Sequence, residues 1–248
     1  PFTLFWLVGA INSLNLLDGI DGLATTIGII LCSAITVMAL WFGQPAVAVV
    51  AAVFAGALLG FLRFNFPPAT VYLGDAGSML IGLVIGSLAI GASLKGPATV
   101  AMAAPLAIWS LPMFDSFVAI LRRKLTGRSI YATDRGHLHH RLMARFGKNT
   151  RVLGVVALCC AVTCGGALLS MFMQNDLLAI GSVMLVICLL VATQIFGHVE
   201  FMMLANRMKS VGMSFIQPSK GSGSWQSSVR PGEGTRGLDR PSGRHHLD

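Results

Sequence analysis

The chain has 248 residues, of which 54% are hydrophobic and only 11% are charged. A soluble domain carries about 25% charged residues, so this composition excludes an ordinary water-soluble globular enzyme. The formal net charge of +8 is unevenly distributed along the chain.

Uncharged apolar runs of about the length of a membrane span follow one another along the sequence. A bilayer core of about 30 Å needs roughly 20 apolar helical residues. A partial run, 2–11, opens the chain, and the full-length runs are 24–42, 46–62, 78–94, 98–121, 152–173 and 177–197. We therefore predict an all-α, polytopic integral membrane bundle with about six full spans and a partial N-terminal span.

Basic residues predict which loops face the cytoplasm. Between Arg122 and Arg151, nine Lys and Arg residues stand against one acid, Asp134, so the positive-inside rule places this loop in the cytoplasm. Alternation along the chain then places 12–22, 63–77 and the end of the chain on the same side. We expect a membrane-embedded domain, 1–199, with the cytoplasmic loop 122–151. The remaining residues, 200–248, are rich in Gly, Ser, Arg and Pro and are predicted to form a disordered cytoplasmic tail.

Two amides and two acids recur every three residues in the first polar segment, NSLNLLDGIDGLA: Asn12, Asn15, Asp18 and Asp21. On a helix this spacing would place them roughly along one face, and the neighbouring glycines would permit close approach of a ligand. Oxygen ligands of this kind suit Mg²⁺ bound together with substrate phosphates. The alternative is a polar loop that caps the next helix.

The second polar segment, VYLGDAGSMLIG, places Asp75 between two glycines, before a membrane helix that we expect to open at Ser78. The N-terminus of a helix favours an anion or a metal-bound diphosphate. The alternative is that Asp75 only caps the helix. Asp115, in the apolar run before the basic loop, is a second ambiguous acid. Intramembrane acids are functional candidates, but it could equally pair with Arg122 or Arg123, or brace a helix kinked at Pro112.

The segment YATDRGHLHHRLM carries His137, His139 and His140 between two arginines. Zinc binding would need further ligands that are not nearby in sequence. A solvated basic turn is one alternative, and binding of a phosphorylated substrate, with arginine as a bidentate clamp, is the other. The three polar segments together predict phosphoryl chemistry at the boundary between water and lipid.

Three segments, NLLDGIDGLA, VYLGDAGSMLIG and PMFDSFVAILRRKLTGRSIYATDRGHLHHRL, resemble in order and spacing the signatures of the polyprenyl-phosphate N-acetylhexosamine-1-phosphate transferases, glycosyltransferase family 4. The His-Leu-His-His pattern is more similar to the branch that uses UDP-N-acetylglucosamine. The resemblance implies transfer of a sugar 1-phosphate, here GlcNAc-1-phosphate, from a UDP-N-acetylhexosamine to undecaprenyl phosphate, which initiates cell-surface polysaccharide or cell-wall polymer synthesis.

The resemblance also implies roles for particular residues. Asp18, Asp21 and Asp75 would be catalytic, and Asn15 and Asp75 would contact Mg²⁺, which Mn²⁺ could replace. The residues that would bind substrate are Asn12, Asp134, Arg135, His137, His139 and His140. The implied setting is the inner membrane of a bacterial cell with the site loops in the cytoplasm, no nucleic-acid partner, and a homodimer as one assembly that the family permits.

The family carries a paired-aspartate motif in an earlier loop, and this chain begins after that point. We therefore expect an N-terminally truncated chain that is inactive alone. Two alternatives from other classes are a non-catalytic membrane scaffold and a transporter. A transporter would be expected to place its polar residues at the bilayer midplane, whereas these residues collect at one interface.

Overall fold

The computed structural model describes residues 1–93, 100–127, 137–195 and 202–203. The chain divides into two units, Pro1–Lys209 and Ser210–Asp248, and every described residue belongs to the first. Apart from residues 202–203, the predicted tail lies outside the described residues, as do Asp134 and Arg135.

The described residues form helices and no strands. The helices are α1 (Phe2–Leu17), α2 (Leu23–Trp41), α3 (Pro45–Asn65), α4 (Gly74–Ser93), α5 (Val100–Leu125), α6 (Leu138–Phe146), α7 (Asn149–Met173) and α8 (Asp176–Ala192). Four of them, α2, α3, α7 and the stretch Gly74–Ala92 of α4, are long and apolar enough to cross a membrane, while α1 and α8 are shorter apolar helices. The chain is thus a polytopic helical membrane protein, as the sequence predicts.

Local sequence explains where several helices begin and end. Pro45 occupies the first turn of α3, where its missing N–H costs nothing. Asn175 caps α8 by accepting a hydrogen bond from the N–H of Leu177 at 3.0 Å. Gly147 ends α6 in a left-handed conformation with φ of 65°. The run containing Pro105 and Pro112 forms a single helix, α5, since prolines are tolerated in membrane helices.

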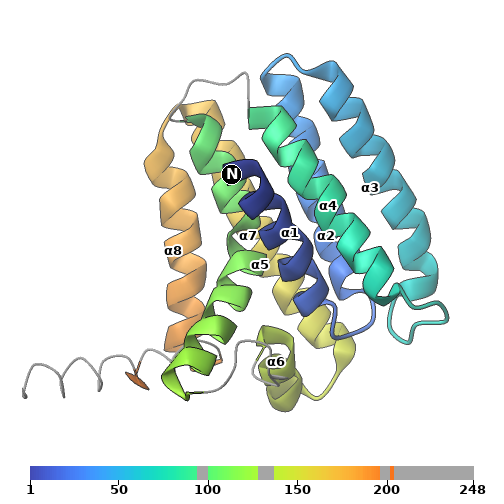
Figure 1. Ribbon diagram of the computed structural model, residues 1–248, viewed down its shortest axis with the longest axis vertical. Helices are drawn as coiled ribbons and strands as arrows, with labels where there is room; N and C mark the ends of the chain where they lie inside the picture. Colours follow the sequence, from blue (N-terminus) through green and yellow to red (C-terminus); the bar gives the residue numbers. More distant parts are fainter. Residues whose placement is uncertain (94–99, 128–136, 196–201, 204–248) are drawn as a thin grey trace, which may run out of the picture. The chain divides into compact units, whose positions relative to one another are not determined.

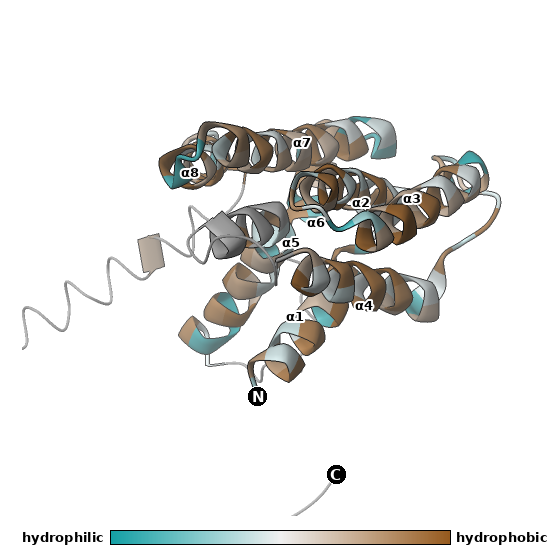
Figure 2. Cartoon of the chain, turned by 90° about the horizontal axis from the view of Figure 1, so that it is seen from above, coloured by the Kyte–Doolittle hydropathy of each residue, from teal (hydrophilic) through white to brown (hydrophobic). Residues whose placement is uncertain are grey.

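Helix α2 lies at the centre of the bundle and contacts α1, α3, α4, α5 and α7. It is the most buried of the four candidate spans, with 61% of its apolar stretch inside the protein, whereas α3 is the least buried, with 22%. Figure 2 shows α3 at the edge of the bundle with a largely hydrophobic surface. The apolar side chains of α3 therefore face outward, toward the lipid that the composition predicts.

Helices α1 and α4 pack at unusually close range. A Cβ on Gly82 would lie 2.7 Å from the carbonyl oxygen of Ala10 and one on Gly86 would lie 2.8 Å from the Cβ of Ala10. Beside this contact, Trp6 Nε1 donates to the carbonyl of Gly86 at 3.0 Å. Glycine is required at these positions because the neighbouring helix leaves no room for a side chain.

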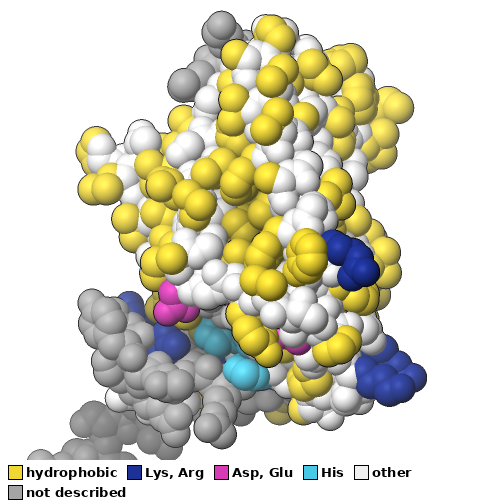
Figure 3. Space-filling model, turned by 90° about the vertical axis from the view of Figure 1, so that its right-hand side faces the viewer, with side chains coloured by type: hydrophobic (Ala, Val, Ile, Leu, Met, Phe, Trp, Pro, Cys, Tyr) yellow, Lys and Arg dark blue, Asp and Glu magenta, His cyan; other side chains and the backbone are white. Residues whose placement is uncertain are grey.

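The connections that carry the predicted site lie at one end of the bundle. Figure 1 shows the α1–α2 loop, the α3–α4 loop and α6 together at the lower end. Figure 3 shows the same separation on the surface, with hydrophobic side chains above and the acidic and histidine side chains near the bottom. These segments therefore share one end of the bundle, while the side of the membrane that they face stays a prediction.

Candidate functional site

The first acidic segment is a tight loop rather than a continuous helix. Helix α1 ends at Leu17, Asp18 is its C-terminal cap, and Gly22, with φ of 76°, opens α2. The expected alignment of four polar residues along one helix face is therefore wrong for Asp18 and Asp21, because the helix stops before them. We call residues 18–22 the acidic loop.

The two amides that precede the acidic loop differ in position. Asn12 donates to the carbonyl of Val8 in its own helix at 2.7 Å and does not line the pocket described below. Asn15 lies one turn closer to the loop and reaches α4. Its Nδ2 is 3.4 Å from Asp75 Oδ1 and donates to Ser78 Oγ at 3.0 Å. Asn15 therefore connects α1 to the first turn of α4.

Asp75 lies in the first turn of α4, which begins at Gly74 rather than at the expected Ser78. Gly74 has φ of 68°, a conformation that favours glycine. The hydroxyl of Ser78 donates to the backbone carbonyl of Asp75 at 3.1 Å, while the carboxylate turns toward Asn15. Asp75 is thus held beside α1 and does more than cap the start of its own helix.

Asn65, at the end of α3, is a site residue that the sequence prediction missed. Its Oδ1 accepts hydrogen bonds from the N–H of Gly22 at 3.1 Å and from Thr25 Oγ1 at 2.8 Å, and its Nδ2 donates to the carbonyl of Val71 at 3.0 Å. Asn65 is buried, so these bonds fix the α3–α4 connection against the start of α2. The only sequence signal is a polar amide that closes an apolar run before Pro67 and Pro68.

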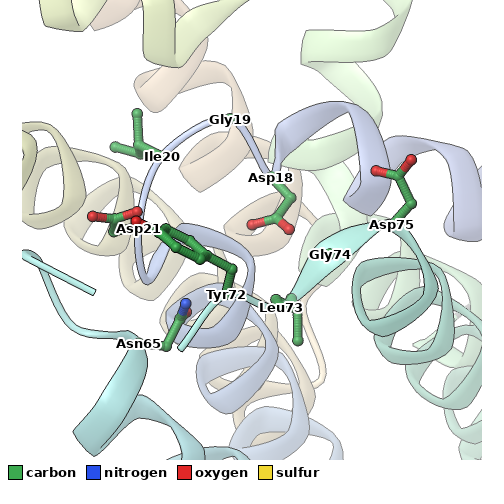
Figure 4. Close-up of a pocket in the computed structure, with 9 residues that line it drawn as sticks. All are labelled: Asp18, Gly19, Ile20, Asp21, Asn65, Tyr72, Leu73, Gly74 and Asp75. Atoms are coloured by element: carbon green, nitrogen blue, oxygen red, sulfur yellow. The ribbon is translucent and has the colours of Figure 1, made fainter. Parts of the chain in front are cut away.

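Asp21 binds the same connection from the other side. Its Oδ2 accepts a hydrogen bond from the N–H of Ala69 at 3.1 Å. Asp21 therefore holds the α3–α4 connection in place and is also one of the residues that line the pocket (Figure 4).

A pocket of about 230 Å³ lies where these loops meet, lined by Asp18, Gly19, Ile20, Asp21, Asn65, Tyr72, Leu73, Gly74 and Asp75. Figure 4 shows the carboxylate of Asp18 between Tyr72 and Asp75, with the backbone of the acidic loop around it. Burial raises the pKa of Asp18 to about 6, the nearby charges of Asp75 and Asp21 add to this rise, and the N–H of Ala24 opposes it. Asp18, Asp21 and Asp75 thus line one small pocket, and Asp18 ionises at a higher pH than an ordinary aspartate.

The histidine segment reaches the acidic loop through α6. His139 is buried, and its imidazole packs directly on Gly19, so that a Cβ at Gly19 would overlap the ring. Neither ring nitrogen of His139 has a hydrogen-bond partner among the described residues. Burial, followed by the neighbouring charge of His140, lowers the pKa of His139 to about 4, although Asp115 opposes this. His139 therefore presents a neutral imidazole beside the acidic loop.

The other histidines differ in their surroundings. The ring of His140 is exposed and lies 4.2 Å from that of His139, centre to centre. His137 is buried, and its Nδ1 hydrogen-bonds Asp115 Oδ2 at 2.9 Å. Asp115 therefore pairs with a histidine, a partner that the sequence had not suggested.

The donor set fits a divalent cation held jointly with a substrate. Within the described ranges no three His, Cys, Asp or Glu side chains converge as a complete metal site. Mg²⁺, however, is usually bound by one or two carboxylates together with substrate phosphates. Asp18 and Asp75 would supply two such carboxylates. Burial is the main cause of the raised pKa of Asp18, the charges of Asp75 and Asp21 add to it, and a cation would offset these effects.

The fold and the site together define a helical membrane protein whose acids and histidines meet at one end of the bundle. Residues 1–93 match the family model described as glycosyl transferase family 4. Over these residues the chain is similar to glycosyl transferase family 4, as the sequence segments NLLDGIDGLA and VYLGDAGSMLIG predict.

Curated relatives are named for related transfer reactions. The chain is 41% identical over 152 residues to a probable undecaprenyl-phosphate N-acetylglucosaminyl 1-phosphate transferase of Bacillus subtilis, covering 61% of this chain and 42% of the relative. It is 35% identical over 193 residues to the decaprenyl-phosphate N-acetylglucosaminephosphotransferase of Mycobacterium tuberculosis, covering 68% and 47%. It is 33% identical over 164 residues to the phospho-N-acetylmuramoyl-pentapeptide-transferase of Clostridium kluyveri, covering 66% and 50%. The chain spans about half the length of the curated relatives it matches.

Proposed function

We propose that this chain carries a large part of the active site of a membrane transferase that moves N-acetylhexosamine 1-phosphate from a UDP-sugar to undecaprenyl phosphate. GlcNAc-1-phosphate is the expected group, and the reaction would begin synthesis of a cell-surface polysaccharide or cell-wall polymer. The observation that carries the proposal is a pocket at the end of an apolar bundle that Asp18 and Asp75 line, with His139 packed on Gly19 of the same pocket. The names of the relatives support the same class of reaction.

A site at the end of membrane helices suits one water-soluble and one lipid-soluble substrate. The donor would enter the pocket between the acidic loop and Asp75, whereas the polyprenyl chain would remain beside the apolar helices. We expect the site loops to face the cytoplasm of a bacterial cell, where nucleotide sugars are made, as the basic loop predicts.

The proposed chemistry depends mainly on positioning and charge. Asp18 and Asp75 would hold Mg²⁺, which would neutralise the diphosphate of the donor. Asn15 holds Asp75 in place, and Asp21 and Asn65 fix the backbone around the pocket. The neutral imidazole of His139 can donate a hydrogen bond to a phosphate or sugar oxygen without adding charge. Attack of the lipid phosphate on the β-phosphorus would then release UMP.

Transfer can be tested in a chimaera in which this chain replaces the aligned part of the Bacillus subtilis relative. We expect Mg²⁺-dependent release of UMP from UDP-N-acetylglucosamine and undecaprenyl phosphate in membranes that contain the chimaera. Asp18→Asn and Asp75→Asn should each lower the rate by about 10²–10³-fold, because each removes a charge that acts in the transition state. Gly154→Ala is the matched control, since a Cβ there meets nothing within 4 Å.

The same experiment separates an enzyme from a membrane scaffold. A scaffold requires the fold but no ionised carboxylate in the pocket, so both Asn variants would retain the polymer in cells at normal protein levels. Binding of UDP-N-acetylglucosamine to the 248-residue chain in nanodiscs, with and without Mg²⁺, provides an independent measurement. Full activity in both Asn variants would contradict the proposal.

A further inference from the structure

Asp115 is a fully buried acid in the second half of α5, and both of its oxygens are engaged. Oδ2 hydrogen-bonds His137 Nδ1 at 2.9 Å, and Oδ1 accepts the N–H of Leu138 at 2.8 Å. Leu138 is the first residue of α6, and the N–H groups of a first turn have no partner within their own helix. A carboxylate at this position also interacts favourably with the helix dipole. One side chain of α5 therefore anchors the start of α6.

The far end of α6 is also held by the bundle. Arg145 Nη1 donates to the carbonyl of Thr193 at 3.1 Å, just beyond the end of α8. Between the two ends, Leu138 and Leu142 are buried. The short helix is thus attached to α5 and to the end of α8, which leaves it little freedom to shift along the bundle.

The contact between His139 and the acidic loop depends on this attachment. The imidazole of His139 packs on Gly19, yet neither ring nitrogen makes a hydrogen bond to the described residues. Within the described part of the chain, no hydrogen bond of His139 therefore fixes the ring there. Since His139 is adjacent to Leu138, its position follows from the anchor that Asp115 provides.

We propose that Asp115 is a positioning residue of the site: by holding the first turn of α6, it seats His139 against Gly19. Asp115 thereby joins the acidic loop and the histidine helix into one wall that faces the diphosphate and sugar of the donor. The identity of that ligand rests on the proposed function, whereas the effect of Asp115 on His139 does not.

Histidine labelling tests the geometry directly. The full chain in nanodiscs is treated with diethyl pyrocarbonate, and the labelling rate of each histidine is measured by mass spectrometry. We expect rapid labelling of the exposed His140 and protection of His137 and His139. Asp115→Leu removes both acceptors but keeps a side chain branched at Cγ, and it should raise the labelling rate of His139 by about 10–100-fold, as expected for loss of a buried charged hydrogen-bond pair.

Two further variants make this result specific. Asp115→Asn retains an acceptor for the N–H of Leu138 and should preserve most of the protection. Ser116→Ala removes a hydroxyl that is buried on the same helix and has no partner among the described residues, so it should leave every rate unchanged. If Asp115→Leu fails to fold, His137→Asn replaces it, and we expect partial exposure of His139. Protection of His139 within twofold of the wild type in the folded variant would overturn the proposal.

Ligand binding separates positioning from simple stability. The Kd for UDP-N-acetylglucosamine should rise at least tenfold in Asp115→Leu, recover in Asp115→Asn and remain unchanged in Ser116→Ala. If the unmodified chain does not bind the nucleotide sugar, the proposed function fails, while the labelling result still decides whether Asp115 seats His139. If it binds and Asp115→Leu has the same Kd although His139 is labelled, Asp115 has no part in the site.

Discussion

Gly19→Ala tests the contact between the acidic loop and α6. A Cβ on Gly19 would overlap Nε2, Cε1 and Cδ2 of His139. The ring cannot retreat easily because α6 is anchored at Asp115 and at Thr193. Overpacking of this kind costs about 1–3 kcal/mol, which corresponds to a shift of about 5–150-fold between the seated and displaced positions of α6.

Thermal unfolding in detergent measures this cost. We expect Gly19→Ala to lower Tm by about 3–10 °C. Gly154→Ala, in open space on α7, should leave Tm unchanged or raise it slightly, since alanine favours helix. In a His139→Ala background, Gly19→Ala should have little further effect, because the overlapping ring is gone. An equal loss of Tm in both backgrounds would refute a clash with His139.

The remaining predictions concern protonation, metal affinity and loop stability. The pKa of Asp18 is raised from 3.8 to about 6 and that of His139 is lowered from 6.5 to about 4. Acidification through this range therefore stabilises the folded chain through Asp18 and destabilises it through His139. In denaturant unfolding with EDTA, the free energy of unfolding of Asp18→Asn should decrease as the pH is lowered, whereas that of His139→Gln should increase. Equal dependence on pH in the two variants would contradict this. Asn15→Ala releases Asp75 and should raise the Mg²⁺ concentration for half-maximal binding of UDP-N-acetylglucosamine by about 10–100-fold; an unchanged value would exclude a supporting role. Asn65→Ala leaves buried donors unpaired and should lower the free energy of unfolding by about 1–3 kcal/mol, and a loss below about 0.5 kcal/mol would show that the bonds contribute little.

Hydropathy and charge were sufficient to predict the fold class and the common end of the polar loops. Apolar length determines where a chain can cross a bilayer, and alternation of crossings determines which loops meet. The spacing of Asp18 and Asp21 was less informative, because a helical period was extended past Leu17, where α1 ends. The positive φ of Gly22, the residue immediately before α2, is a local event that periodicity does not predict.

Long-range contacts account for what the sequence left open. The sequence suggested arginine partners for Asp115 on its own helix but not His137, which lies 22 residues away in sequence and hydrogen-bonds it at 2.9 Å. Asn65 carried no motif, and its role appears only where α3 meets the start of α2. Such pairings depend on how helices pack, and a single sequence does not contain their geometry. The assignments of Asp134 and Arg135 remain predictions, because both lie outside the described residues.

The glycine contact between α1 and α4 has a consequence for where harmful substitutions can occur. Gly86 lies eleven residues beyond Asp75 on α4, a distance of about 16 Å along the helix axis. Because Asn15 and Asp75 come from these two helices, a slip of one residue, about 1.5 Å, between them would break their 3.4 Å contact. A bulkier side chain at Gly86 would then displace Asp75 without lying near the pocket. The packing of α1 against α4 at Gly82 and Gly86 thus sets the alignment of Asn15 and Asp75 at the end of the bundle.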